Sequence, residues 1–314
     1  MALIAAIALY SVLIIAFGIQ GVWTDLLEIP RGLLLLALSV GLIGQLAFFW
    51  RWQWSLQWLK QSLHWRRSAE IYASGLALMA TPGRSGEAMR ALWLKQRHGI
   101  PAQVGLGVTL SERLSDLASA VLVLGWGLGI AAMPMMFLSA AVLIAGAAVI
   151  SHPKALRQLE ALLKNLRWLQ QQRRLHRLSQ SALLSLRQVR HLVQPTPLIL
   201  ATSCGCLIWL MEASIMHGLF QAMAAPINLN QAAVIRTAMA LGGVLSLLPA
   251  GIGTSEATSI GIAMAYGASS DQALLATLII RISTLVLPCG LGWLVLRRQS
   301  LGSPNNSKHA GTDE

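Results

Sequence analysis

Charged residues are scarce in this chain. Of its 314 residues only 11% are Asp, Glu, Lys or Arg, whereas 55% are hydrophobic. Soluble domains carry about 25% charged residues, so the composition excludes an ordinary soluble protein and is typical of a membrane protein with many spans. Acidic residues are the scarcest, because 12 Asp and Glu stand against 24 Lys and Arg and leave a net charge of +12.

Residues that usually carry chemistry are also few. Cys204, Cys206 and Cys289 all lie in apolar segments, and the seven histidines do not stand at the spacing of metal ligands. Buried thiols are therefore favoured over a disulfide or a metal site. The sequence also lacks a recognisable hydrolase triad or ATP-binding loop. We expect no enzyme activity, no cofactor and no metal.

Long apolar runs dominate what is present. About 20 apolar residues span a bilayer as a helix, which satisfies its own backbone hydrogen bonds in lipid. The runs do not alternate with the period of two that marks the strands of a membrane barrel. We therefore predict an all-α polytopic membrane protein. The runs are Met1–Ile19, Leu33–Trp50, Val104–Leu128, Pro134–Ile150, Pro197–Phe220, Ala232–Leu248 and Gln272–Leu296.

The distribution of basic residues predicts the topology, because Lys and Arg concentrate in cytoplasmic loops. The loop Gln20–Pro30 carries only Asp25 and Glu28, so we place it outside and both termini in the cytoplasm of a bacterial inner membrane. Met1–Ile19 has no preceding cation and no small-residue cleavage site, so we interpret it as a span rather than a signal peptide. The basic loops hold Arg51, Lys60, Arg66 and Arg67, then Lys95 and Arg97, then nine Lys or Arg between residues 151 and 194, then Arg297 and Arg298.

The basic residues flank the spans, so anionic lipid headgroups are the expected partners and nucleic acid is not. In the segment 151–196, leucines recur among the cations at positions 156, 159, 162, 163 and 166. This spacing predicts an amphipathic helix on the inner leaflet, with a cytoplasmic protein partner as the alternative. A homo-oligomer is left open. The polar tail 299–314 is expected to be disordered.

Two stretches of the chain repeat one another, 81-TPGRSGEA-88 and 248-LPAGIGTSEA-257. Glu87 is followed 26 residues later by Arg113, and Glu256 is followed 25 residues later by Arg281. Each arginine precedes an apolar residue and a serine. We therefore divide a membrane domain, 1–298, into a first repeat at 1–130 and a second at 134–298, related by an offset of about 168 residues, with the segment 151–196 as a cytoplasmic insert.

Helix-breaking residues interrupt each repeat. The arms on either side are too short to span, so we predict two re-entrant hairpins that enter from opposite faces. The prediction is an inverted repeat of about six full spans and two hairpins, with Arg236 as the residue that fits it least well. Ser85 and one of Thr254 and Ser255 are expected to cap the half-helices Glu87–Leu94 and Glu256–Tyr266. The breaks are Pro82, Gly83, Pro249, Gly251 and Gly253.

Four ionisable residues fall within the predicted membrane region, namely Glu87, Arg113, Glu256 and Arg281. Each costs about 2.5–3.5 kcal/mol or more at the centre of a helix, so they should face one another or water. One interpretation is a polar substrate path with gates. The other is a pair of salt bridges that hold each hairpin against the helix that follows it.

Further polar residues near the breaks are candidates for binding an anionic headgroup. The N-termini of half-helices attract anions, which implicates Ser85, Thr254 and Ser255. Arg84 and Arg90 either grip a phosphate or anchor the first hairpin at the cytoplasmic interface.

Glu112 and Asp116 flank Arg113 on one predicted helix, where residues three apart can pair. These residues and the two break motifs resemble the lysylphosphatidylglycerol synthase/flippase transmembrane family over nearly all of residues 1–298. The resemblance implies lipid translocation across the plasma membrane. In its multi-domain members a soluble aminoacyl-transferase domain follows, and we expect this chain to lack it.

The sequence therefore favours a flippase for an anionic phospholipid or a polyprenyl-phosphate-linked lipid. Two alternatives stay open: a membrane-embedded glycosyltransferase, or its accessory, acting on polyprenyl-linked sugars, and a membrane scaffold.

Overall fold

The computed structural model describes residues 19–79, 81, 85–129, 173–246 and 248–301, with scattered positions between 134 and 162. In this part of the chain every regular element is a helix, which confirms the all-α prediction. The predicted span Met1–Ile19 lies outside the described residues except for Ile19, and about half of the predicted span Pro134–Ile150 lies outside them. Most of 151–172 and the tail beyond Leu301 also lie outside the described residues.

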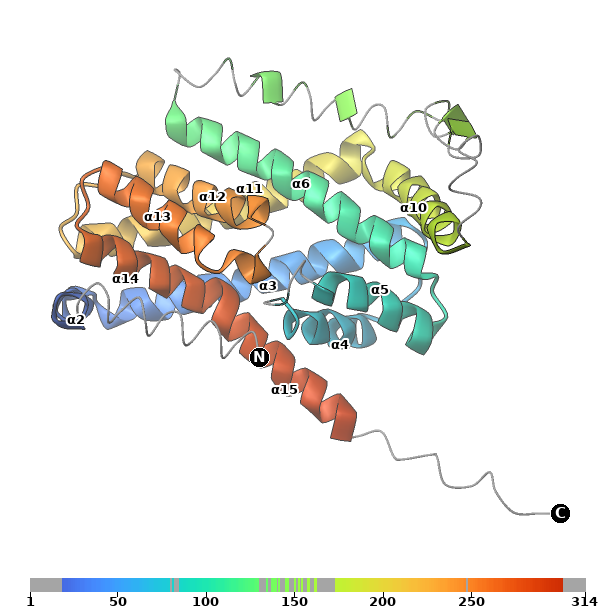
Figure 1. Ribbon diagram of the computed structural model, residues 1–314. Helices are drawn as coiled ribbons and strands as arrows, with labels where there is room; N and C mark the ends of the chain where they lie inside the picture. The colour runs from blue at the N-terminus through green and yellow to red at the C-terminus, as the bar shows by residue number, and fades with distance from the viewer. Residues whose placement is uncertain are drawn as a thin grey trace.

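Long helices form the frame of the protein (Figure 1). Among the described residues, three stretches are long and apolar enough to cross a membrane: α3 at Arg31–Trp58, α11 at Pro195–Ala222, and Ser270–Arg298. The last of these contains α14 (Ser270–Arg281), the π-helical turn η4 (Ile282–Val286) and most of α15 (Leu287–Leu301).

A fourth long helix, α6 at Ala102–Leu128, packs against both α11 and α5. It carries three charged residues near its middle, Glu112, Arg113 and Asp116. The short helix α2 (Ile19–Glu28) precedes α3 and packs against α14.

Two helical hairpins occupy the places that the break motifs predict. The first pairs α4 (Trp65–Leu76) with α5 (Ser85–His98). The second pairs α12 (Leu229–Leu245) with α13 (Thr254–Ala265) across the short 3₁₀ helix η3 (Pro249–Gly251). Figure 1 shows the hairpins entering from opposite ends of the bundle with their turns toward its centre. The order of long helix, hairpin and long helix thus occurs twice, and the orientation in the membrane stays a prediction.

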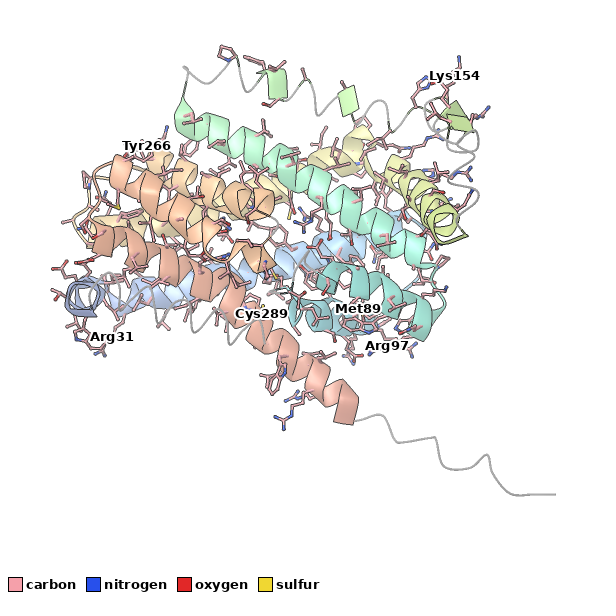
Figure 2. The ribbon with its side chains drawn as sticks, in the orientation of Figure 1. Arg31, Met89, Arg97, Lys154, Tyr266 and Cys289 are labelled. Carbon is pink, nitrogen blue, oxygen red and sulfur yellow. The ribbon has the colours of Figure 1, made fainter. Side chains whose placement is uncertain are left out.

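The turns of the two hairpins meet under the last long helix. Leu285 and Cys289 form a small buried cluster, against which Met79 of the first turn and Ala250 of the second turn both pack. Figure 2 shows Cys289 in the middle of the molecule, with Arg31 at one end. The centre of the protein is therefore a junction between the two halves.

Helix α10 (Arg173–Leu192) is the continuous helix described within the predicted basic segment, and it packs along α6. Leu183 and Val189 on its inner face are buried. The approach is close, because a Cβ atom at Gly107 of α6 would lie 2.6 Å from the Cβ of Gln188. One face of this amphipathic helix is therefore covered by protein, and its position at a leaflet stays a prediction.

Candidate functional site

The first hairpin and α6 are joined by the ion pair that the repeat predicts. Arg113 Nη2 lies 2.8 Å from Glu87 Oε1, and Arg113 Nη1 lies 3.3 Å from Asp116 Oδ2 one turn further along α6. The Arg113 side chain is 36% exposed, although it lies in the middle of an apolar bundle. One cation therefore holds two carboxylates and still reaches the surface.

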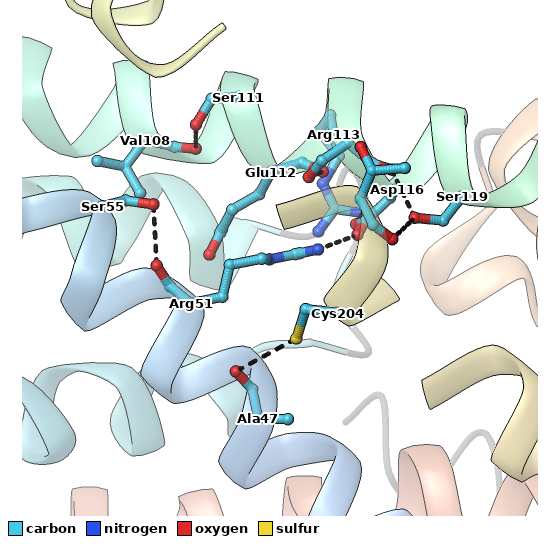
Figure 3. A network of polar contacts seen from close by, with 12 residues as sticks. Ala47, Arg51, Ser55, Val108, Ser111, Glu112, Arg113, Asp116, Ser119 and Cys204 are labelled. Atoms are coloured by element: carbon cyan, nitrogen blue, oxygen red, sulfur yellow. Dashed lines mark hydrogen bonds and ion pairs between the residues drawn. The ribbon is translucent and has the colours of Figure 1, made fainter. Parts of the chain in front are cut away.

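Arg51 belongs to the same network, which corrects its assignment to a basic loop. It lies inside α3, is 6% exposed, and its Nη1 is 2.7 Å from Asp116 Oδ1. Figure 3 shows the side chain extending from α3 to Asp116 on α6. The prediction was wrong because the apolar run ends at Trp50 whereas the helix continues to Trp58 through an aromatic stretch.

Arg90 is also buried, and its two alternative roles, gripping a phosphate or anchoring the hairpin at the cytoplasmic interface, stay predictions. Its guanidinium lies over the rings of Trp52 and Tyr72, at 4.6 and 4.9 Å from their centroids. Its Nη2 lies 3.3 Å from Glu112 Oε2. Two aromatic faces and a carboxylate thus surround this cation. Arg84, Pro82 and Gly83 lie outside the described residues.

The second hairpin is closed by a tighter version of the same pairing. Arg281 Nε donates to Glu256 Oε1 at 2.5 Å, and Arg281 Nη2 donates to the carbonyl of Ala250 at 2.9 Å. The other oxygen of Glu256 accepts from the backbone N–H of Gly253 at 2.6 Å. The pair therefore fixes both sides of the turn between the helices.

The turn itself shows why the sequence breaks there. Ala250, Gly251 and Gly253 have φ angles of 52°, 65° and 92°, a region that glycine enters without steric cost and other residues rarely adopt. Pro249 starts the short 3₁₀ helix. The predicted helix break at Pro249, Gly251 and Gly253 is therefore present.

The predicted caps are wrong. Gly253, rather than Thr254 or Ser255, occupies the N-cap position of α13, and Glu256 reaches back from the third helical position to accept its N–H. Thr254 instead donates to the carbonyl of Gly251 at 3.2 Å. Ser255 is buried where α12 comes close to the turn, and only 2% of its surface is exposed.

Ser85 is the first residue of α5 rather than its cap. Its hydroxyl shares a 2.6 Å hydrogen bond with that of Thr81. This contact ties the start of α5 to the end of the preceding turn.

Sequence reasoning missed a further buried pair, between Glu212 of α11 and Arg236 of α12. Arg236 also lies over the ring of Trp209, 5.8 Å from its centroid. Arg236, which fitted the prediction least well, is thus paired with a single glutamate in an apolar helix. One signal was present, because the two residues are 24 positions apart, close to the spacing of the other Glu–Arg pairs.

The helix after Arg281 contains the π turn η4. The carbonyl of Ile280 accepts hydrogen bonds from the hydroxyls of Ser283 and Thr284, at 2.9 and 2.7 Å. Helix α3 approaches this turn through Gly41, where a Cβ atom would lie only 2.4 Å from the carbonyl oxygen of Ser283. Single π turns inside α-helices are frequent at functional sites.

A small cavity with polar and apolar walls lies beside the first network, between α3, α6 and the junction of α10 and α11. Its polar lining comes from Arg51, Ser55, Ser111, Glu112 and Ser115. Its apolar lining comes from Trp54, Leu192, Pro197, Leu198 and Ala201. Within the described residues, no group of His, Cys, Asp and Glu side chains is arranged to hold a metal ion.

Comparison with known families decides the affiliation. The sequence pattern of the lysylphosphatidylglycerol synthase TM region matches residues 3–292 of the 314 residues. The chain belongs to this family. The predicted family is therefore confirmed, and with it the prediction of a membrane protein. No individually curated protein is significantly similar to the chain.

The two halves of this family member present their shared Glu–Arg pair differently. In the first half the side chains of Arg113 and Glu87 are 36% and 17% exposed. In the second half those of Arg281 and Glu256 are 10% and 1% exposed. The first pair is accessible and the second is enclosed.

Proposed function

We propose that this protein moves an anionic lipid, a phospholipid or a polyprenyl-phosphate-linked lipid, across a bacterial inner membrane, with both termini in the cytoplasm. The observation that carries this proposal is the side chain of Arg113, which is 36% exposed in the middle of the bundle. Membership of a family named for a lipid synthase agrees with a lipid substrate.

Arg113 has the properties of a headgroup-binding residue. A guanidinium offers five N–H donors and cannot lose its charge in a protein. Glu87 and Asp116 engage the two terminal nitrogens, whereas Nε is buried and has no hydrogen-bond partner among the residues that the structure describes. A phosphate that displaces one carboxylate gains a bidentate contact. The first turn of α5, which holds Glu87, adds the partial positive charge of a helix N-terminus.

The difference between the halves suggests how the lipid would move. Arg281 is occupied by Glu256 and by the backbone of the turn, so it is closed to a ligand in this arrangement. Rocking of one repeat against the other would exchange the open and closed states. In this mechanism Glu87 and Glu256 act as gates, and Ser85 and Thr254 lie at the helix starts that the headgroup passes.

Lipid movement in proteoliposomes tests the proposal. Fluorescent phosphatidylglycerol, phosphatidylcholine and a polyprenyl phosphate are supplied in one leaflet, and their arrival in the other is followed by quenching. We expect the wild type to move one of the anionic lipids, and Arg113→Gln to slow that movement by about 10–100-fold, the effect of losing a charged hydrogen bond of about 1.5–3 kcal/mol.

Lys95→Gln is the matched control, because it removes one exposed cation from α5 at a distance from the network. It should move lipid at the wild-type rate. Equal rates for Arg113→Gln and the wild type, with both proteins folded, would exclude the headgroup site. No movement of any lipid by the wild type would favour the glycosyltransferase-accessory or scaffold alternatives.

A further inference from the structure

Glu112 is a buried carboxylate that the proposed lipid site does not use. It neighbours Arg113 on α6 but points toward Arg90, and it is 4% exposed. Its contact with Arg90 measures 3.3 Å, whereas the closest contacts of Glu87 and Asp116 with arginine measure 2.8 and 2.7 Å. Of the three carboxylates in the network, Glu112 therefore forms the longest and weakest ion pair.

The small cavity described above lies next to this carboxylate. The hydroxyls of Ser55, Ser111 and Ser115 in its wall donate to backbone carbonyls at 2.8, 2.8 and 2.9 Å. Their oxygens therefore keep lone pairs that can accept a hydrogen bond. The cavity is about the size of one water molecule. Glu112 thus lines one cavity with three hydrogen-bond acceptors, and an ionised Glu112 faces Arg90 and Arg51.

The fold of a hairpin does not require the charges of Glu112 and Asp116. With the offset that aligns Arg113 with Arg281, the second half has Ile280 in the place of Glu112 and Thr284 in the place of Asp116. Its hairpin has the same pair of arms and the same Glu–Arg closure. Glu112 is therefore an addition to the repeat.

The charges around Glu112 balance only when it is ionised. Three arginines, on α3, α5 and α6, face three carboxylates, on α5 and α6, and the phenol of α4 lies beside them. Among the described residues, α10 and α11 add only apolar side chains to the cavity wall. The groups are Arg51, Tyr72, Glu87, Arg90, Glu112, Arg113 and Asp116. Protonation of Glu112 leaves this cluster with one excess positive charge.

We infer that Glu112 is a proton-binding site whose protonation strengthens the binding of an anionic headgroup at Arg113. The inference rests on the proposed lipid site. An excess positive charge beside Arg113 attracts a phosphate, and by linkage a bound phosphate favours the protonated acid to the same extent. One proton taken up from water with one monoanionic headgroup makes a neutral pair, so their joint transfer moves no net charge.

Infrared difference spectroscopy tests the proton site without any lipid substrate. Acidification of the detergent-solubilised wild type should produce a carboxylic-acid C=O band that is missing in Glu112→Gln. Arg90→Gln removes the nearest cation and should make the band appear at higher pH. A wild-type spectrum that Glu112→Gln leaves unchanged would overturn the inference, whatever the protein does to lipids.

Binding of short-chain phosphatidylglycerol tests the linkage. The wild type should bind about 5–150-fold more tightly at acidic than at neutral pH, the usual range for two coupled sites. Glu112→Gln should bind tightly at both pH values, whereas Glu70→Gln, on the exposed face of α4, should behave as the wild type. The linkage would be overturned if folded Glu112→Gln still bound the lipid more tightly at acidic than at neutral pH. Absence of binding to the wild type at both pH values would count against the lipid site itself and leave the infrared result to decide on the proton site.

Discussion

Glu256 and Arg281 close the second hairpin with a single ion pair that also holds the backbone of its turn. One carboxylate oxygen accepts from Arg281 Nε at 2.5 Å, and the other accepts from Gly253 N–H at 2.6 Å. The arginine completes the ring by donating to the carbonyl of Ala250 at 2.9 Å. A turn that takes three positive φ angles in five residues is thereby fixed by two side chains.

Removing one partner of this pair should destabilise the protein severely. Glu256→Ala leaves the Arg281 cation buried without its carboxylate and frees the turn, which we expect to cost about 3–5 kcal/mol of unfolding free energy. The measurement is thermal unfolding in detergent. The double variant Glu256→Gln with Arg281→Gln should lose less than the sum of the two single variants, and an additive loss would show that the two residues do not interact.

The pair of Glu212 and Arg236 should behave differently when both members are replaced. Arg236→Ala leaves a buried carboxylate and should cost about 3–5 kcal/mol, whereas Glu212→Leu combined with Arg236→Met should be neutral or stabilising by about 1–4 kcal/mol. Lipid transport should survive in the double variant, because this pair lies outside the network of Arg113. Loss of transport in a stable double variant would give the pair a role that we have not assigned.

The close approach of α3 to the π turn predicts a strong effect of one methyl group. Gly41→Ala places a Cβ atom 2.4 Å from the carbonyl oxygen of Ser283, so the two backbones must separate. We expect a loss of about 1–3 kcal/mol, the usual cost of overpacking. Gly32→Ala on the same helix meets no atom of the described residues within 4 Å and should be neutral or slightly stabilising. Equal unfolding temperatures for the two variants would contradict the packing.

His98 at the end of α5 predicts a pH dependence of stability. Partial burial, followed by the charges of Arg67 and Arg97, lowers its pKa below the ordinary 6.5. The unfolded chain therefore takes up a proton more readily than the folded protein as the pH falls below 6.5, so acidification reduces stability in that window. The drop in unfolding temperature between about pH 8 and about pH 5.5 should be smaller in His98→Gln than in the wild type. A drop of the same size in both would contradict this.

The sequence predicted the paired parts of the site because they repeat. Glu87 with Arg113 and Glu256 with Arg281 stand at nearly equal spacing, and charges in an apolar run must find partners. Glu212 occurs in no motif, so only its partner Arg236 was noticed, as a misfit. A single charge in a long apolar run shows that a partner exists but does not identify it.

Burial along the chain was harder to predict than pairing. Arg51 follows an apolar run and precedes Trp52 and Trp54, a composition that the membrane interface and a protein interior share. The structure buries Arg51 because Asp116 on another helix meets it. Hydropathy reads one segment at a time and does not detect a partner 65 residues away. The cap of α13 was wrong for a related reason, because a carboxylate three residues into the helix took the place of the expected hydroxyls.

The contact of both hairpin turns with Leu285 and Cys289 makes the two halves mechanically dependent. Met79 and Ala250 rest on the same two side chains, so neither turn can leave its place without uncovering part of the support of the other. The thiol of Cys289 is 4% exposed within that contact. In a chain whose other two cysteines are changed to alanine, the rate at which this one thiol reacts with an alkylating reagent would therefore report how often the centre of the protein opens, whichever hairpin moves first.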